Sequence, residues 1–145
     1  MYKMILLPTD GSALSEKIAP TALDFARLTG GKIVALYVVQ PYPFPTVTDG
    51  GVGFDPEVYE QQMNEAARLH LDKIGDLARA ANIPFEGIIA RSPSPYEEIV
   101  ETAARLNCDI ILMASHGRKG LNKLFLGSET QKVLAHTTLP VLVLR

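Results

Sequence analysis

Short apolar runs alternate along the chain with longer stretches of helical periodicity. The apolar runs predict five strands, over residues Tyr2–Leu7, Lys32–Val39, Phe85–Ala90, Asp109–Ala114 and Val141–Leu144. Several of these runs are nearly continuous in apolar residues, which is typical of strands covered on both faces. We therefore expect them to form a buried parallel sheet.

Four amphipathic segments lie between the predicted strands, over residues Ser12–Leu28, Glu57–Ala81, Pro95–Leu106 and Ser128–His136. In the first, Ser12 is a candidate N-cap, Gly30 a candidate stop, and Pro20 predicts a kink or weak turn because it has no N–H. The apolar stripe predicted for the second consists of Met63, Ala66, Ala67, Leu69, Ile74, Leu77 and Ala78.

Alternation of strands with helices of this length favours a doubly wound α/β fold, because parallel neighbours need a crossover connection. A chain of 145 residues is expected to form one domain, 1–145. The irregular segment Gln40–Pro56 is dense in proline and glycine and follows the second strand directly. It is either a flap over a bound ligand or a surface insertion.

Composition narrows the classes of function. A formal charge of −2 gives no overall basic excess, so nucleic-acid binding is not expected. No apolar run reaches the length of a membrane span and Pro8 interrupts the first one early, so we expect a cytoplasmic protein without membrane association. Cys108 is the single cysteine, which excludes an intrachain disulfide and favours a small buried apolar role.

Candidate ligand contacts lie where strands end, because open α/β sheets bind ligands at the carboxyl ends of their strands. Asp10 follows the first strand, where a carboxylate can accept hydrogen bonds from ribose hydroxyls or help to hold a hydrated divalent cation. The alternative is a turn or capping role ahead of Ser12.

The segment after the fourth strand is richer in signals. Gly127 and Ser128 lie at the predicted start of a helix, where unpaired N–H groups suit phosphate oxygens. A capping box between Ser128 and Gln131 is the alternative. Three basic residues of the loop either raise its positive potential or form a solvated surface: Arg118, Lys119 and Lys123.

Missing motifs exclude several enzyme classes. The chain has no G-x-x-x-x-G-K-[ST], no G-x-G-x-x-G after the first strand and no G-x-S-x-G, which argues against a Walker-type loop, a dinucleotide-binding dehydrogenase and an α/β-hydrolase. His116 has no acidic or cysteine partner at metal-ligand spacing. Asp10, His116 and Lys119 are not in a recognised catalytic spacing, so the sequence does not favour an enzyme.

Four segments together resemble the universal stress protein family over essentially the full length: ILLPTDGS, ALYVVQP, SPYEEIVETAARLNCDIILMASHGRKGL and LGSETQKVLAHTTLPVLVLR. Nucleotide-binding members of that family carry G-x2-G-x9-G-[ST] after the fourth strand. This chain matches at Gly117, Gly127 and Ser128 and departs at the first glycine, which is Ala114. A methyl group fits there if the backbone angles are those of an ordinary strand end, and it hinders the ligand if the ribose packs directly on that Cα or if φ is positive.

The resemblance implies binding of ATP with Mg²⁺ or Mn²⁺, and we expect at most slow hydrolysis of that ATP. The residues it implicates are Pro8, Thr9, Asp10, Val38, Met113, Ala114, Gly117, Gly127, Ser128 and Glu129 through its N–H, with Asp10 also beside the metal ion. The predicted function is a nucleotide-dependent switch in the stress response, read by an unknown protein partner. The alternative is a dimeric stress or interaction protein that works without nucleotide.

The resemblance also implies the sheet order 3-2-1-4-5 and a homodimer formed through the last strand. Val141–Leu144 supports the dimer independently, because an apolar strand at a sheet edge leaves backbone groups unpaired unless another chain covers them.

Overall fold

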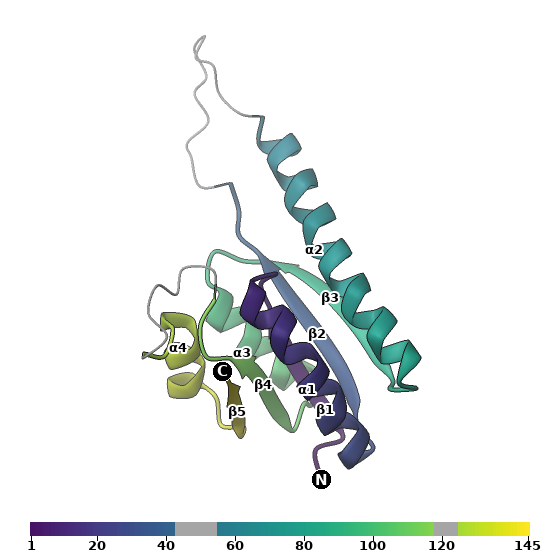
Figure 1. The fold of residues 1–145 in the computed structure, drawn as a ribbon. Coiled ribbons are helices and arrows are strands. Elements are labelled where there is room, and N and C mark those ends of the chain that lie inside the picture. The colour runs from purple at the N-terminus through teal and green to yellow at the C-terminus, as the bar shows by residue number, and fades with distance from the viewer. Residues whose placement is uncertain (43–54, 118–124) are drawn as a thin grey trace.

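The computed structural model describes residues 1–42, 55–117 and 125–145. Its strands are β1 (Met4–Thr9), β2 (Lys32–Val39), β3 (Phe85–Arg91), β4 (Ile110–Ala114) and β5 (Val141–Leu144). Its helices are α1 (Ala13–Thr29), α2 (Pro56–Ala80), α3 (Pro95–Arg105) and α4 (Ser128–His136). The strands pair in parallel in the order β3-β2-β1-β4-β5, which confirms the predicted doubly wound sheet (Figure 1).

The sheet has a helical layer on each face, with α1 and α2 on one side and α3 and α4 on the other (Figure 1). Alternate residues of β1 enter different cores: Ile5 and Leu7 pack on the α1 side, whereas Leu6 packs on the α3 side. Cys108 is buried on the α3 side as expected. Burial, and secondarily the charge of Asp109, raises the pKa of its thiol to about 11.

Two predicted boundaries at the start of the chain need correction. β1 begins at Met4 rather than Tyr2, since Tyr2 has a φ of 58°, which ends an extended run. At its other end β1 continues through Pro8 to Thr9.

Ser12 caps α1 by accepting a hydrogen bond from the Ser15 N–H at 3.2 Å, as predicted. α1 continues as one helix through the exposed Pro20, and the kink or weak turn predicted there stays a prediction.

The buried face of α2 also differs from the predicted stripe. The residues it buries are Ala67, His70, Leu71, Ile74 and Ala78. Leu69 and Leu77, both assigned to the stripe, are 66% and 48% exposed. Positions three and four apart share one face of a helix with 3.6 residues per turn, and the buried residues follow this spacing. The face that meets the sheet therefore includes His70.

β1 and β4 are paired over a much shorter length than β1 and β2. β1 pairs with β2 from Met4 to Thr9, but with β4 only through Ile5 and Leu6. At the amino end the Asp109 carboxylate ties the two strands by accepting hydrogen bonds from the N–H groups of Lys3 (2.8 Å) and Met4 (3.2 Å). Toward their carboxyl ends, β1 and β4 are not paired with each other. The strand order of the sheet reverses between these two strands. We call this place the switch point.

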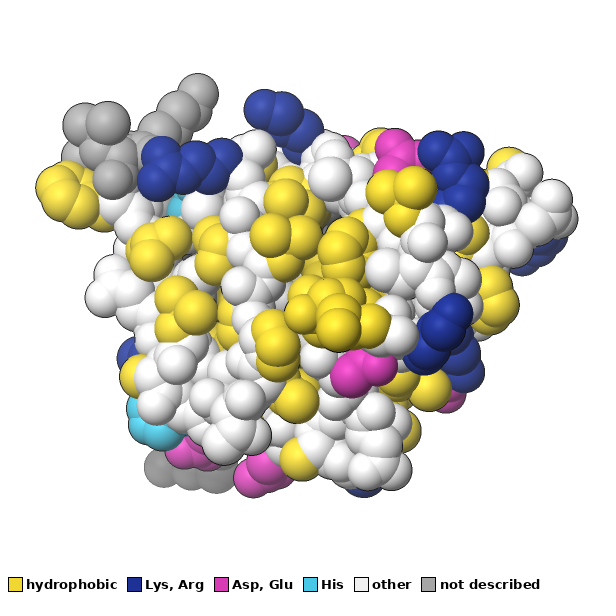
Figure 2. Space-filling view, turned by 90° about the horizontal axis from the view of Figure 1, so that it is seen from below, with side chains coloured by type: hydrophobic (Ala, Val, Ile, Leu, Met, Phe, Trp, Pro, Cys, Tyr) yellow, Lys and Arg dark blue, Asp and Glu magenta, His cyan; other side chains and the backbone are white. Residues whose placement is uncertain are grey.

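Hydrophobic side chains gather at one end of the molecule (Figure 2). The face at the amino ends of the strands, seen from below in Figure 2, carries hydrophobic side chains across its middle and Lys and Arg side chains toward its border. Among the described residues, no helix combines the length and the apolar character that a bilayer span requires.

A cavity of about 880 Å³ lies between α2 and β3, away from the switch point. Leu71 and Phe85 are among its lining residues.

Candidate functional site

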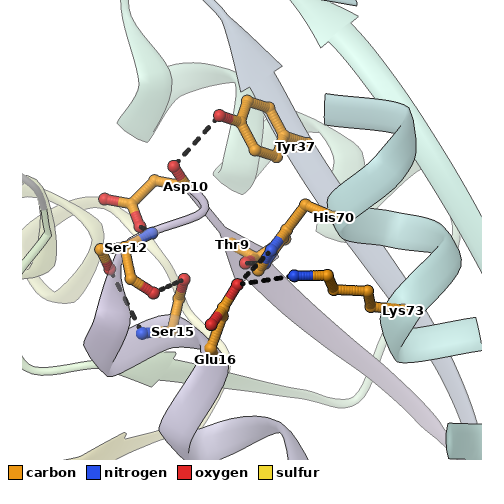
Figure 3. Close-up of polar contacts among 8 residues, drawn as sticks. All are labelled: Thr9, Asp10, Ser12, Ser15, Glu16, Tyr37, His70 and Lys73. Carbon is orange, nitrogen blue, oxygen red and sulfur yellow. Dashed lines mark hydrogen bonds and ion pairs between the residues drawn. The ribbon is translucent and has the colours of Figure 1, made fainter. Parts of the chain in front are cut away.

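The loop after β1 is a tight turn that fixes Asp10. Gly11 has a φ of 75°, a conformation that favours glycine, and the Asp10 Oδ1 accepts a hydrogen bond from the Ser12 N–H at 2.9 Å. The Tyr37 hydroxyl of β2 donates to the Asp10 carbonyl at 3.1 Å (Figure 3). The Asp10 carboxylate is therefore presented by a turn that is held at its carbonyl and at its side chain.

Thr9, which precedes that turn, is held by α2. Its Oγ1 lies 2.6 Å from the Nε2 of His70, and both residues are buried (Figure 3). The Glu16 carboxylate of α1 lies 3.6 Å from the His70 Nδ1 and 3.6 Å from the Lys73 ammonium. Burial lowers the pKa of His70 below its ordinary value, although Glu16 and Asp10 act in the opposite direction.

The described ends of the loop after β4 are held by backbone hydrogen bonds and by one hydroxyl of α4. The Ser115 N–H donates to the Leu144 carbonyl and the Gly127 N–H donates to the Ser115 carbonyl, each at 2.7 Å. The Thr130 hydroxyl of α4 donates to the Ala114 carbonyl at 3.0 Å. These contacts fix both ends of the loop whose residues 118–124, including Arg118, Lys119 and Lys123, lie outside the described residues.

Two glycines allow this loop to approach its neighbours closely. A side-chain carbon at Gly117 would collide with the Oδ2 of Asp10, and one at Gly127 would lie 3.0 Å from the Cα of His116. Asp10 and Gly117 therefore meet across the ends of β1 and β4. The same geometry gives each glycine a role in packing the chain against itself.

The backbone at Ala114 is ordinary strand. Among the described residues other than glycine, positive φ angles occur at Tyr2, Asn82 and Asn107. Ala114 ends β4, is paired with Leu144, and packs on the core that α1 covers. The backbone condition under which a methyl group is tolerated is thus met.

α4 begins at Ser128 as predicted, but the capping box does not form. Gly127 is the N-cap, Ser128 is the first helical residue, and no side chain caps the helix. The Gln131 side chain instead donates to the Leu126 carbonyl at 2.8 Å. The Glu129 carboxylate accepts from the Tyr96 N–H of α3 at 2.9 Å, so this side chain joins the two helices.

The remaining predicted contacts divide between the faces of the sheet. Val38 and Met113 pack on the α3 side, and alternation along β1 directs the buried Pro8 to the same side. The Thr9 side chain turns toward α2. Thr9 would therefore meet a ligand on the α3 side through its backbone rather than its hydroxyl.

Asp10 is the one predicted metal contact. Within residues 1–42, 55–117 and 125–145, no group of three His, Cys, Asp or Glu side chains is placed to hold a metal ion. A divalent cation beside Asp10 would therefore need oxygen ligands from phosphate and water, as Mg²⁺ commonly has.

Sequence reasoning missed two residues that hold the β1 loop, His70 and Tyr37. His70 had a signal: it follows Ala67 by three residues and precedes Ile74 by four, so a polar ring lies on the apolar face of a helix. Tyr37 had none, because its strand reads as a uniformly apolar run.

Comparison with known proteins decides the family. The model of the universal stress protein family matches residues 1–145. The chain belongs to the universal stress protein family. Universal stress protein MJ0531 of Methanocaldococcus jannaschii is 30% identical over 145 residues, which cover the whole of this chain and 83% of that protein.

Solved structures agree on the fold. The structure of MJ0577 from Methanocaldococcus jannaschii has 30% identity and a TM-score of 0.85, covering 99% of this chain and 96% of that chain. A universal stress protein from Archaeoglobus fulgidus, solved in complex with dAMP, has 18% identity and a TM-score of 0.65, covering 100% of this chain and 98% of that chain. At that lower identity the likeness shows the fold alone.

Proposed function

We propose that this universal stress protein binds ATP with Mg²⁺ or Mn²⁺ at the switch point and acts in the cytoplasm as a nucleotide-dependent switch in the stress response. The observation that carries the proposal is the close approach of the Asp10 carboxylate to Gly117. It puts an acidic group beside the loop that leads to the start of α4. The relative solved with dAMP supports an adenine nucleotide as the ligand.

Each part of the ligand has a matching element. The N–H groups at the start of α4, from Ser128 onward, carry the positive end of the helix dipole and suit the phosphates. Asp10 suits a cation bridging those phosphates. Val38 and Met113, which pack on the α3 side of the sheet, supply an apolar border for adenine. Occupancy would then change the loop surface that a protein partner meets.

The proposal is tested by calorimetric titration of nucleotide-stripped protein with ATP, once with Mg²⁺ and once with EDTA. We expect saturable binding at about one site per chain. Asp10→Asn keeps the oxygen that accepts from the Ser12 N–H and removes the charge. It should weaken Mg–ATP roughly tenfold, equivalent to about 1.4 kcal/mol, and ATP in EDTA much less.

The matched control is Asp24→Asn, which removes an exposed carboxylate of α1 that pairs with Arg27. Its affinity should equal that of the wild type. An equal loss in both variants would show that the Asp10 effect is net charge rather than contact. Absence of binding to the wild-type protein at millimolar ATP would refute the proposal.

A nucleotide-independent stress or interaction protein is the second candidate. The observation that favours it is that Gly117 and Gly127 are both needed for close packing within the chain. The glycine pattern would then serve the fold alone. Under this candidate, ATP neither binds nor raises the melting temperature.

We also propose that two copies pair through β5 as a homodimer. β5 stands at the edge of the sheet, and Leu142 in it is 36% exposed. Leu142→Lys should shift the mass measured by sedimentation equilibrium from dimer to monomer. Leu28→Lys, at an 84% exposed position of α1, is the control and should leave the mass unchanged. A wild-type monomer at micromolar concentration would disprove the dimer.

A further inference from the structure

His70 is a buried polar side chain with a specific partner at the proposed site. It is 6% exposed, and its Nε2 lies 2.6 Å from the hydroxyl of Thr9, at the last position of β1. The next residue is Asp10. The contact links α2 to the turn that carries the proposed ligand carboxylate.

Residues of α1, α2, β1 and β2 surround His70. Glu16 of α1 and Lys73 of α2 face the Nδ1 side, where Glu16 is 3.6 Å from each of the two side chains. The ring of Tyr37 from β2 meets the imidazole edge-on at 6.1 Å between centroids. Tyr37 also donates to the Asp10 carbonyl. The backbone from Thr9 to Asp10 is thus held at the Thr9 side chain and at the Asp10 carbonyl (Figure 3).

The position of Asp10 has little tolerance. Its Oδ2 lies so close to Gly117 that no side-chain carbon fits between them, and its Oδ1 bonds the Ser12 N–H. A small rotation of the Thr9–Asp10 peptide would break the bond to Ser12 or press the carboxylate into the Gly117 loop. Displacements of this size change the binding of a ligand that needs both loops.

We propose that His70 is a positioning residue, which holds Thr9 and thereby sets the Asp10 carboxylate against the Gly117 loop. This role rests on the proposed nucleotide function for its biological meaning. The structural part of the proposal, that His70 fixes the turn at Asp10, does not depend on nucleotide binding and is measured without ligand.

Three variants test the role. His70→Leu fills the volume and removes the partner of Thr9, whereas His70→Gln places an amide near the position of Nε2. Thr9→Val removes the same hydrogen bond from its other end with almost no change in shape. Lys73→Met is the matched control, since Lys73 lies on the same side of α2 and approaches Glu16, and is 71% exposed.

The first readout is affinity for Mg–ATP by calorimetry. His70→Leu and Thr9→Val should each weaken binding roughly tenfold, and the double variant no more than either, because one contact is lost in all three. His70→Gln should stay within about threefold of the wild type, and Lys73→Met should match it. Equal losses in His70→Gln and His70→Leu, or additive losses in the double variant, would overturn the role.

The second readout needs no nucleotide: hydrogen exchange of the Ser12 amide, which bonds Asp10. Exchange should be at least about tenfold faster in His70→Leu and in Thr9→Val than in the wild type, and restored in His70→Gln. If wild-type protein binds no ATP, the proposed function fails, and this exchange still decides the role of His70. Unchanged exchange in a folded His70→Leu, or in Thr9→Val if the leucine variant does not fold, would refute it.

Discussion

The loop after β1 and the loop after β4 face each other at the switch point but are held by different contacts. Side chains from other elements hold the first: His70 bonds Thr9, and Tyr37 bonds the carbonyl of Asp10. At the second, the described ends are held by backbone hydrogen bonds, by the Thr130 hydroxyl and by the close approaches at Gly117 and Gly127. One loop depends on which partners are present, and the other on the absence of a methyl group.

This difference explains why the loop after β4 carries a recognisable sequence motif and the loop after β1 does not reveal its partners. Glycines at fixed spacing form a motif that can be recognised in one chain. Partners that come from distant elements do not, since His70 lies 61 residues after Thr9. The two loops should also respond differently to mutation, the β4 loop to added volume and the β1 loop to lost hydrogen bonds.

The largest effect is expected from added volume in the β4 loop. Gly127→Ala places a carbon 3.0 Å from the His116 Cα, so backbone must move, at a cost of about 1–3 kcal/mol in the free energy of unfolding. Gly87→Ala is the control, because its added carbon meets Leu71 at an ordinary 3.4 Å. Urea unfolding measures both. Equal stabilities would contradict the packing role of Gly127.

The next effect concerns pH and the β1 loop. Because burial lowers the pKa of His70 in the folded protein, the unfolded chain takes up this proton first as the pH falls. The His70 contribution to stability is complete above about pH 6.5 and is lost as the pH falls through the folded pKa. His70→Gln should remove this part of the slope in urea unfolding between about pH 7.5 and 5. The same slope in the wild type and in His70→Gln would argue against burial of a neutral His70.

A smaller effect is expected from the second contact on the β1 loop. Tyr37→Phe removes the hydrogen bond to the Asp10 carbonyl and should cost about 0.5–1.5 kcal/mol in the free energy of unfolding. Mg–ATP affinity should fall in the same variant. Tyr59→Phe in α2, whose ring lies 5.2 Å from that of Tyr42, is the control for loss of a tyrosine hydroxyl. No change in either quantity would mean that the Tyr37 hydroxyl does not hold the turn.

The smallest effect is expected at Ala114. Ala114→Gly loosens a strand residue with ordinary backbone angles and should cost about 0.5–1 kcal/mol in unfolding free energy. ATP affinity should change less than twofold, an amount below about 0.4 kcal/mol. Calorimetry and urea unfolding measure the two quantities. A large gain in affinity would show that the methyl group obstructs the ligand.

The helices and strands were predictable because their signals are local, whereas the sheet order came from the family resemblance. Strands such as Lys32–Val39 and caps such as Ser12 and Gly30 depend on neighbours in sequence, and the structure confirms them. The helical stripe of α2 failed at Leu69 and Leu77 because apolar residues occur on more than one face of that helix. Only tertiary packing selects the face that is buried.

The candidate site was predictable only in part. The start of α4 at Ser128 followed from glycine and helix signals, and the alternative, a capping box between Ser128 and Gln131, does not form. The Gln131 side chain instead donates to the Leu126 carbonyl, and spacing cannot decide between this acceptor and the Ser128 N–H. The contact between Asp10 and Gly117 joins residues more than a hundred positions apart and required the sheet order to be known.

The short ladder between β1 and β4 has a mechanical consequence. The sheet consists of two blocks, β3-β2-β1 and β4-β5, joined through Ile5 and Leu6 and fastened at one end by the Asp109 carboxylate. Beyond Leu6 the two blocks are held together by side chains rather than by a ladder, because residues of β1 and β4 share one core with α1 and another with α3. Substitutions in those shared cores would therefore change the distance between the ends of β1 and β4 while the ladders within each block stay intact.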